Sequence, residues 1–67
     1  MYILVNGKET EIQAGDTATS LISRLQLNPH TIVIERNGTI LKKQQWDETT
    51  LNQGDRLEIV TFVGGGD

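Results

Sequence analysis

The chain contains no cysteine, a single histidine and a single proline among its 67 residues. The absence of cysteine excludes disulfide bonds, thiolate-bound metal and a thiol nucleophile, and it favours the cytoplasm as the compartment. One histidine and scattered carboxylates offer no convergent ligand set, so we expect no metal site and no bound cofactor. Nine acidic residues outnumber six basic ones, for a net charge of −3. Binding to a nucleic-acid backbone is therefore not expected either.

Long apolar segments are also missing, so we expect neither a signal peptide nor a membrane span. The length fits one small domain with no room for a large internal pocket. Hydrophobic residues make up 36% of the chain and charged residues 22%, which are proportions typical of a sequence that folds.

Two Asn-Gly pairs, Asn6-Gly7 and Asn37-Gly38, each lie between apolar runs. Asn-Gly favours the positive backbone angles of a type I′ turn, so each pair predicts a β-hairpin. The first hairpin joins residues 1–5 to residues 8–13, with Met1, Ile3, Val5 and Ile12 facing inward and Tyr2 and Leu4 outward. The second joins residues 31–36 to residues 39–41, with Ile32 and Ile34 inward.

Residues 17–25 carry the spacing of a short helix. Its apolar positions fall at i, i+3, i+4 and i+7, and they are Ala18, Leu21, Ile22 and Leu25. Asp16 or Thr17 can cap the first turn, and Asn28-Pro29 cannot continue the helix, so both ends are marked.

The rest of the chain predicts an irregular or briefly helical segment and a final strand. Residues 42–52 form the irregular part, anchored by Trp46 and Leu51. After a turn at Gly54-Asp55, the strand over residues 56–62 places Leu57 and Ile59 on one face and Val60 and Phe62 on the other.

This order of elements, β, β, α, β, β, β, predicts an α+β fold. We expect a β-grasp (ubiquitin-like) domain over residues 1–62, with a mixed sheet of four to five strands covered by one helix. The first and last strands would then lie parallel in the middle of the sheet. A plain antiparallel sheet with one helix is the alternative. Residues 63–67 are expected to form a flexible, glycine-rich C-terminal tail.

No constellation of side chains predicts catalysis. A nucleophilic triad could be drawn from Ser20 or Ser23, His30 and an aspartate, but no strand-to-helix elbow surrounds either serine. We therefore expect a protein that is not an enzyme and has no catalytic residues.

One apolar surface is predicted beside the tail. Val60, Phe62 and Val33 would lie on the outer face of the sheet, rimmed by Glu35 and Glu58. Such a surface suits docking of a partner protein. The alternative is that these side chains pack against the loop containing Trp46.

The tail consists of Val63, Gly64, Gly65, Gly66 and Asp67. It follows directly on a predicted core strand, and five extended residues reach roughly 16 Å. Because glycine has no side chain, such a tail can enter a narrow tunnel in another protein. Its functional group would then be a terminal carboxylate.

Four stretches carry a resemblance to a known family: residues 3–8, residues 32–38, the segment around Trp46 and, most specifically, residues 54–66. The last stretch joins a Gly-Asp turn, an apolar strand and a Phe-Val-Gly-Gly sequence. By these features the chain resembles the ThiS family, the ubiquitin-like sulfur carriers of thiazole (thiamin) biosynthesis.

The resemblance implies a sulfur carrier acting as a protein co-substrate. A ThiF-like adenylyltransferase would use ATP to adenylate the carboxylate of Gly66, the second member of the Gly65-Gly66 pair that matches the family's ending. A cysteine desulfurase relay would supply sulfur for a thiocarboxylate, and thiazole synthase would receive it. Asp67 departs from the family pattern, so we expect a protease to remove it.

Three alternatives remain open at this point. A MoaD-like carrier would keep the thiocarboxylate but deliver sulfur to molybdopterin. A ubiquitin-like modifier would form an amide with target lysines. A plain β-grasp binding module would not use its tail chemically.

Overall fold

The computed structural model describes residues 1–62 of the chain. The strands in this part are β1 (Tyr2–Val5), β2 (Lys8–Glu11), β3 (Ile32–Arg36), β4 (Thr39–Leu41) and β5 (Arg56–Thr61). The helices are α1 (Ala18–Arg24) and the 3₁₀ helices η1 (Pro29–Thr31) and η2 (Lys43–Glu48). The predicted tail, residues 63–67, lies outside the described residues.

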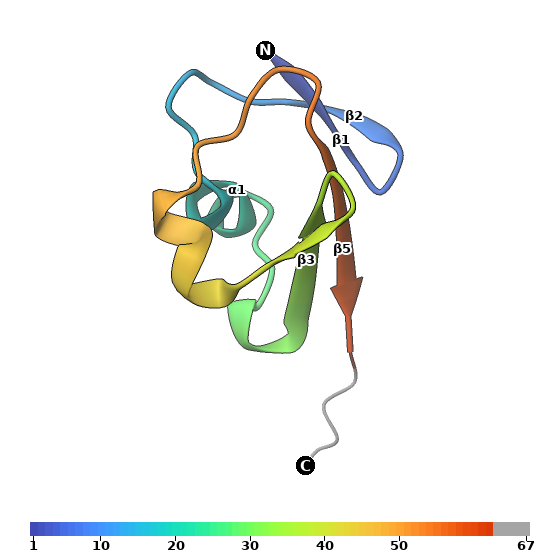
Figure 1. Ribbon diagram of the computed structural model, residues 1–67, viewed down its shortest axis with the longest axis vertical. Helices are drawn as coiled ribbons and strands as arrows, with labels where there is room; N and C mark the ends of the chain where they lie inside the picture. The colour runs from blue at the N-terminus through green and yellow to red at the C-terminus, as the bar shows by residue number, and fades with distance from the viewer. Residues whose placement is uncertain (63–67) are drawn as a thin grey trace.

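The strands form one mixed sheet in the order β2-β1-β5-β3-β4, with α1 and η2 on the same side of it (Figure 1). β5 lies in the centre, parallel to β1 and antiparallel to β3. This is the predicted β-grasp arrangement, and the plain antiparallel alternative is wrong. Among residues 1–62, no helix has the length and apolar character needed to cross a bilayer.

Both hairpin turns have the predicted geometry. Asn6 and Gly7 have φ values of 52° and 80°, and Asn37 and Gly38 have values of 52° and 89°. Positive φ at both central positions defines a type I′ turn, whose twist matches that of the flanking strands. These two turns therefore fix the register of the two hairpins.

The start of α1 follows the prediction, and its end at Arg24 lies within one residue of the predicted stretch over residues 17–25. Thr17 is the N-cap, and its side chain accepts a hydrogen bond from the backbone N–H of Ser20. At the other end Gln26 takes a left-handed conformation with φ 59°, and the N–H of Leu27 donates to the carbonyl of Ile22. This Schellman motif ends the helix before Asn28-Pro29.

The C-cap position of Leu25 changes the buried face of α1. Leu25, predicted as the last inward position, is 38% exposed, and Leu27 packs against the core instead. The remaining inward predictions are confirmed except at Met1, which is 44% exposed. The core consists of Ile3, Ile12, Ala18, Leu21, Ile22, Ile32, Ile34, Trp46, Leu51, Leu57 and Ile59, with Val5, Leu27 and Leu41 partly buried around it.

β5 is held by side chains as well as by its neighbouring strands. Beyond the end of β1, the side-chain amide of Asn6 forms the hydrogen bonds that a neighbouring strand would form with β5. The N–H of Ile59 donates to Asn6 Oδ1 at 2.7 Å, and Asn6 Nδ2 donates to the Ile59 carbonyl at 3.1 Å. The start of β5 is fixed by the second hairpin, because the N–H of Arg56 donates to Asn37 Oδ1 at 2.9 Å. Both turn asparagines therefore clamp β5 in addition to shaping their hairpins.

Two buried aspartates fix the loops that lead into α1 and β5. Asp16 accepts hydrogen bonds from Arg24, the Gln13 N–H and the Ser20 hydroxyl. The Arg24 contact, followed by that of Gln13, lowers the pKa of Asp16 to about 2.

Asp55 has a similar role before β5. Burial by itself would raise the pKa of Asp55, but hydrogen bonds from the Asn52 N–H, the Asn37 amide and Arg36 outweigh burial and lower the pKa below its usual value. Both carboxylates are therefore held in the charged form.

The clamp on β5 predicts a stability difference between two glycine substitutions. Asn6→Gly removes both bonds to Ile59 and should lower the free energy of unfolding by about 1–3 kcal/mol, because two backbone groups lose their partners. Gln26→Gly is the matched control, since Gln26 also has positive φ and glycine suits that conformation; it should change stability by less than about 1 kcal/mol. Urea unfolding followed by Trp46 fluorescence measures both. Equal losses of unfolding free energy in the two variants would show that the hydrogen bonds between Asn6 and Ile59 do not stabilise β5.

The lowered pKa values predict acid sensitivity. An aspartate with a lowered pKa stabilises the fold fully above its unfolded pKa of about 3.9, and this contribution is lost as the pH falls through the folded value. Unfolding free energy should therefore fall between about pH 4 and about pH 2. Asp16→Asn should be less stable than the parent at neutral pH and should show a shallower decline in acid. An identical pH dependence in the two proteins would refute this role of Asp16.

Candidate functional site

The chain leaves the sheet at Phe62, from the end of its central strand. Thr61, the last residue of β5, pairs with Ile32, and the N–H of Phe62 donates to the Thr31 carbonyl at 2.9 Å. β5 points toward the end of the molecule opposite the N terminus (Figure 1). The departure point is therefore fixed by hydrogen bonds up to the last described residue.

An exposed apolar surface lies beside this departure point, as the sequence predicts. We call it the exit patch, and it consists of Val33, Val60, Phe62 and Glu58. Val33 is directly opposite Val60 in the β3–β5 ladder, and the exposed fractions of Val33, Val60 and Phe62 are 37%, 57% and 46%. Trp46 is buried in the core cluster with the inward-facing residues. The alternative that Val60 and Phe62 are covered by its segment is therefore wrong.

The strand register extends the outer face of the sheet beyond the exit patch. Glu35 lies opposite Glu58 and Ile40, and Leu4 lies opposite Glu9 and Arg56. The outer face therefore combines exposed apolar groups with four glutamates and one arginine. The charged side chains on this face are Glu9, Glu11, Glu35, Glu58 and Arg56.

The sequence-predicted tail residues lie outside the described part of the chain. These are Val63, Gly64, Gly65, Gly66 and Asp67. The structure therefore describes the strand that leads into the tail and the exit patch beside it.

The residues of the conceivable triad have separate partners. The Ser20 hydroxyl donates to the Thr17 carbonyl at 2.9 Å and to Asp16, so it belongs to the helix cap. His30 Nδ1 lies 3.2 Å from Lys43 Nζ, and Ser23 is exposed. No group of three or more metal-binding side chains occurs within residues 1–62. Nothing in this part of the chain therefore assembles the triad.

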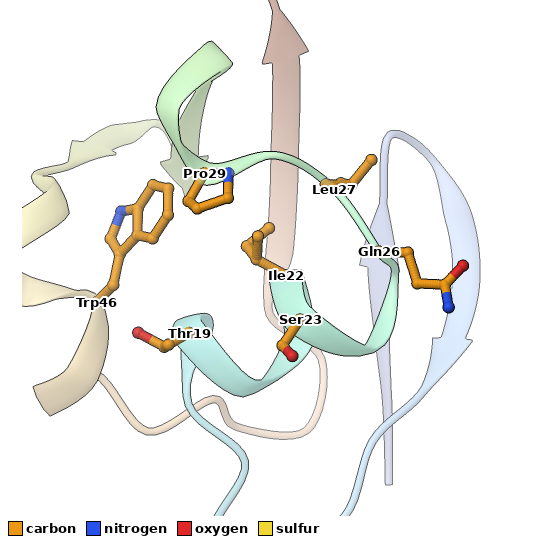
Figure 2. Close-up of a pocket in the computed structure, with 7 residues that line it drawn as sticks. All are labelled: Thr19, Ile22, Ser23, Gln26, Leu27, Pro29 and Trp46. Carbon is orange, nitrogen blue, oxygen red and sulfur yellow. The ribbon is translucent and has the colours of Figure 1, made fainter.

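A surface hollow of about 390 Å³ opens on the helical side of the domain. Figure 2 shows Ile22 at its centre, with Trp46 and Pro29 on one side and Leu27 on the other. The indole N–H of Trp46 donates to the Leu41 carbonyl at 3.1 Å, which fixes this wall. Thr19, Ser23 and Gln26 complete the lining. Among residues 1–62, no ionisable side chain lines the hollow, so this part of the chain offers no group for acid–base chemistry there.

Within residues 1–62, the central β5, the one α-helix packed on one side of the sheet and the exposed outer face define a ubiquitin-like β-grasp protein. A family model described as the ThiS family matches residues 3–66. The chain belongs to the ThiS family.

Individual relatives agree with this assignment. The sulfur carrier protein ThiS of Bacillus subtilis is 39% identical over 64 residues, which cover 92% of this chain and 96% of that protein. The crystal structure of a thiamine biosynthesis protein (ThiS) from Geobacter metallireducens has a TM-score of 0.82 and 33% identity, and the match covers 98% of this chain and all of that one.

A longer relative also matches nearly the whole chain. The thiazole synthase of Paramagnetospirillum magneticum is 36% identical over 66 residues, which are 98% of this chain and 20% of that protein. The chain therefore spans about one fifth of the length of this relative.

Proposed function

We propose that this chain is the sulfur carrier of thiazole (thiamin) biosynthesis and that Gly66 carries the sulfur as a thiocarboxylate. The observation that carries the proposal is the ThiS family match, which runs through to Gly66. The Gly65-Gly66 pair follows within four residues of Phe62, where the hydrogen-bonded part of the chain ends. The chain acts as a co-substrate of other enzymes rather than as an enzyme.

The chemistry needs an activated carboxylate. A free carboxylate is a poor electrophile, so a ThiF-like adenylyltransferase first joins it to AMP from ATP, releasing pyrophosphate. The terminal sulfur of a persulfide on the cysteine desulfurase relay then displaces AMP and forms an acyl disulfide. A thiol such as excess cysteine reduces the S–S bond, which releases the thiocarboxylate and leaves the relay sulfur in a disulfide with that thiol. The acyl adenylate must be shielded from water, which favours a tail whose last residues have no side chains to obstruct a narrow tunnel.

Asp67 must be removed before this activation. While Asp67 is attached, the Gly66 carbonyl belongs to a peptide bond and has no free carboxylate oxygen. Proteolysis after Gly66 therefore precedes adenylation in this proposal. The reach available to Gly66 is then that of residues 63–66, at most about 14 Å beyond Phe62.

Thiazole synthase is the proposed sulfur acceptor. The names of the relatives favour thiamin over molybdopterin, because they include ThiS carriers and a thiamine biosynthesis protein. In two proteins named thiazole synthase, a segment similar to this chain is part of the same polypeptide. A carrier and acceptor that work together gain in effective concentration from such a linkage.

The exit patch is the proposed docking surface for these partners. Val33, Val60 and Phe62 expose apolar area beside the departure point, with Glu58 at the edge. An apolar centre with a polar rim is the usual composition of a protein interface. Docking here would place the start of the tail, Val63 and Gly64, at the mouth of the partner's active site.

Intact mass spectrometry tests the proposal directly. Two chains, one ending at Gly66 and one ending at Asp67, are incubated with ATP, a ThiF-like enzyme, a cysteine desulfurase and cysteine. The Gly66 form should gain the mass difference between sulfur and oxygen, and the Asp67 form should stay unchanged. Thiazole synthase with its other substrates should then return the loaded form to its original mass.

Other outcomes separate the alternatives. A Gly66 form that never gains sulfur would refute the proposal. Adducts to lysines that survive thiol treatment would indicate a protein modifier. A loaded form that gives up its sulfur to a molybdopterin precursor and not to thiazole synthase would indicate the molybdopterin pathway.

A further inference from the structure

A second surface on the outer face lies at the far end from the exit patch. We call it the anchor site, and it consists of Tyr2, Leu4, Glu9 and Glu11. Tyr2 is directly opposite Glu11, and Leu4 is directly opposite Glu9, in the β1–β2 ladder. Side chains in such positions have Cβ atoms about 4.5–5.5 Å apart. The four side chains therefore form one continuous surface.

The anchor site includes a shallow hollow. A depression of about 250 Å³ is lined by Tyr2, Ile3, Leu4, Glu9, Gln53 and Gly54. Its edge is fixed because the backbone N–H of Tyr2 donates to Gln53 Oε1 at 2.8 Å. Tyr2 and Leu4 are 45% and 36% exposed. The hollow thus combines an aromatic ring, an aliphatic wall and a carboxylate.

The carboxylates of the anchor site have no ion-pair partner in the described part of the chain. The ion pairs there join Arg24 to Asp16 and Arg36 to Asp55. Glu9 and Glu11 are exposed, and they lie on one face because they are two residues apart on a strand. Arg56, across from Leu4 on β5, is the one basic residue among the strand positions of this face, which also carry four glutamates. The surface is therefore complementary to a cation.

We propose that the anchor site receives an arginine side chain from the surface of thiazole synthase, an inference that rests on the function proposed above. A guanidinium group can stack on the Tyr2 ring while its N–H groups bond a carboxylate in parallel. Its aliphatic stem fits against Leu4. A lysine would supply the charge but neither the planar stacking nor the paired hydrogen bonds.

The position of the anchor site lets this contact orient the carrier on thiazole synthase. Six residue steps along β5 separate Arg56, beside Leu4, from Phe62, a distance of about 20 Å. A carrier held at the exit patch alone could pivot about that contact. A second contact about 20 Å away fixes the direction in which the tail enters the acceptor, which favours a productive geometry for sulfur transfer.

The hollow beside Trp46 supports no comparable proposal. The described residues that line it include no charged side chain, so they do not identify an occupant. The anchor site differs because its two unpaired carboxylates specify the charge of the group that it receives.

The test compares neutral, isosteric variants. The double variant Glu9→Gln, Glu11→Gln removes the charges with little change in shape, and melting temperature checks the fold. Its dissociation constant for thiazole synthase, measured by calorimetry, should rise about tenfold at low salt and should vary much less with salt than that of the parent. Glu48→Gln is the matched control, because Glu48 is exposed on η2, outside the sheet. It should leave both quantities unchanged.

A comparison with Phe62→Ala separates the two surfaces. That variant should weaken binding while keeping the salt dependence of the parent, because it removes apolar area only. A double variant that binds thiazole synthase as tightly as the parent would overturn the anchor site. A double variant that loses affinity for the activating enzyme alone would overturn it as well. Sulfur loading at Gly66, measured separately by mass, tests the proposed function itself, so the two proposals can fail independently.

Discussion

β5 is bonded along both edges, and the positions of the helix, the outer face and the departing chain depend on that pairing. On one side it pairs with β1 and then with the side chain of Asn6, which acts as one further rung of the ladder. On the other side it pairs with β3 from Leu57 to Thr61, and Phe62 adds a bond to Thr31 beyond the strand. A strand held in this way cannot shift its register without moving Leu57 and Ile59 out of the core. The position of Phe62, where the described part of the chain ends, is therefore fixed by the same packing that stabilises the domain.

The folded domain and the proposed chemistry occupy different parts of the chain. Within residues 1–62 the buried charged groups, Asp16 and Asp55, are fully engaged in holding loops. The reactive group of the proposal is instead a main-chain carboxylate at Gly66, activated and used by other proteins. In the proposed function, the domain supplies the point from which the tail departs, at Phe62, and a face for recognition of the partner proteins.

Sequence patterns that span only a few neighbouring residues predicted most of the fold. The Asn-Gly turns, the alternation of Ile32 and Ile34 and the anchoring of Trp46 and Leu51 depend on local conformation and burial. The turn after α1, which replaces Leu25 by Leu27 at the core, was harder to predict, because Gln26 adopts a left-handed conformation usually taken by glycine. The exit patch was predictable from alternation along β5. The anchor site was not predictable from alternation, since Glu9 and Leu4 become neighbours only through the register of the hairpin. The hydrogen bonds between the Asn6 side chain and Ile59 likewise depend on the pairing of strands that are distant in sequence.

Shortening the tail by deletion of Gly64, in a chain that ends at Gly66, tests most directly whether β5 sets the position of the reactive carboxylate. The measurement is the rate of sulfur incorporation by intact mass, beside the melting temperature. If the reach from Phe62 is fixed, the deletion should leave the melting temperature unchanged and slow incorporation by about a hundredfold or more, because the carboxylate is displaced by more than 1 Å. Incorporation at the parent rate would contradict the account.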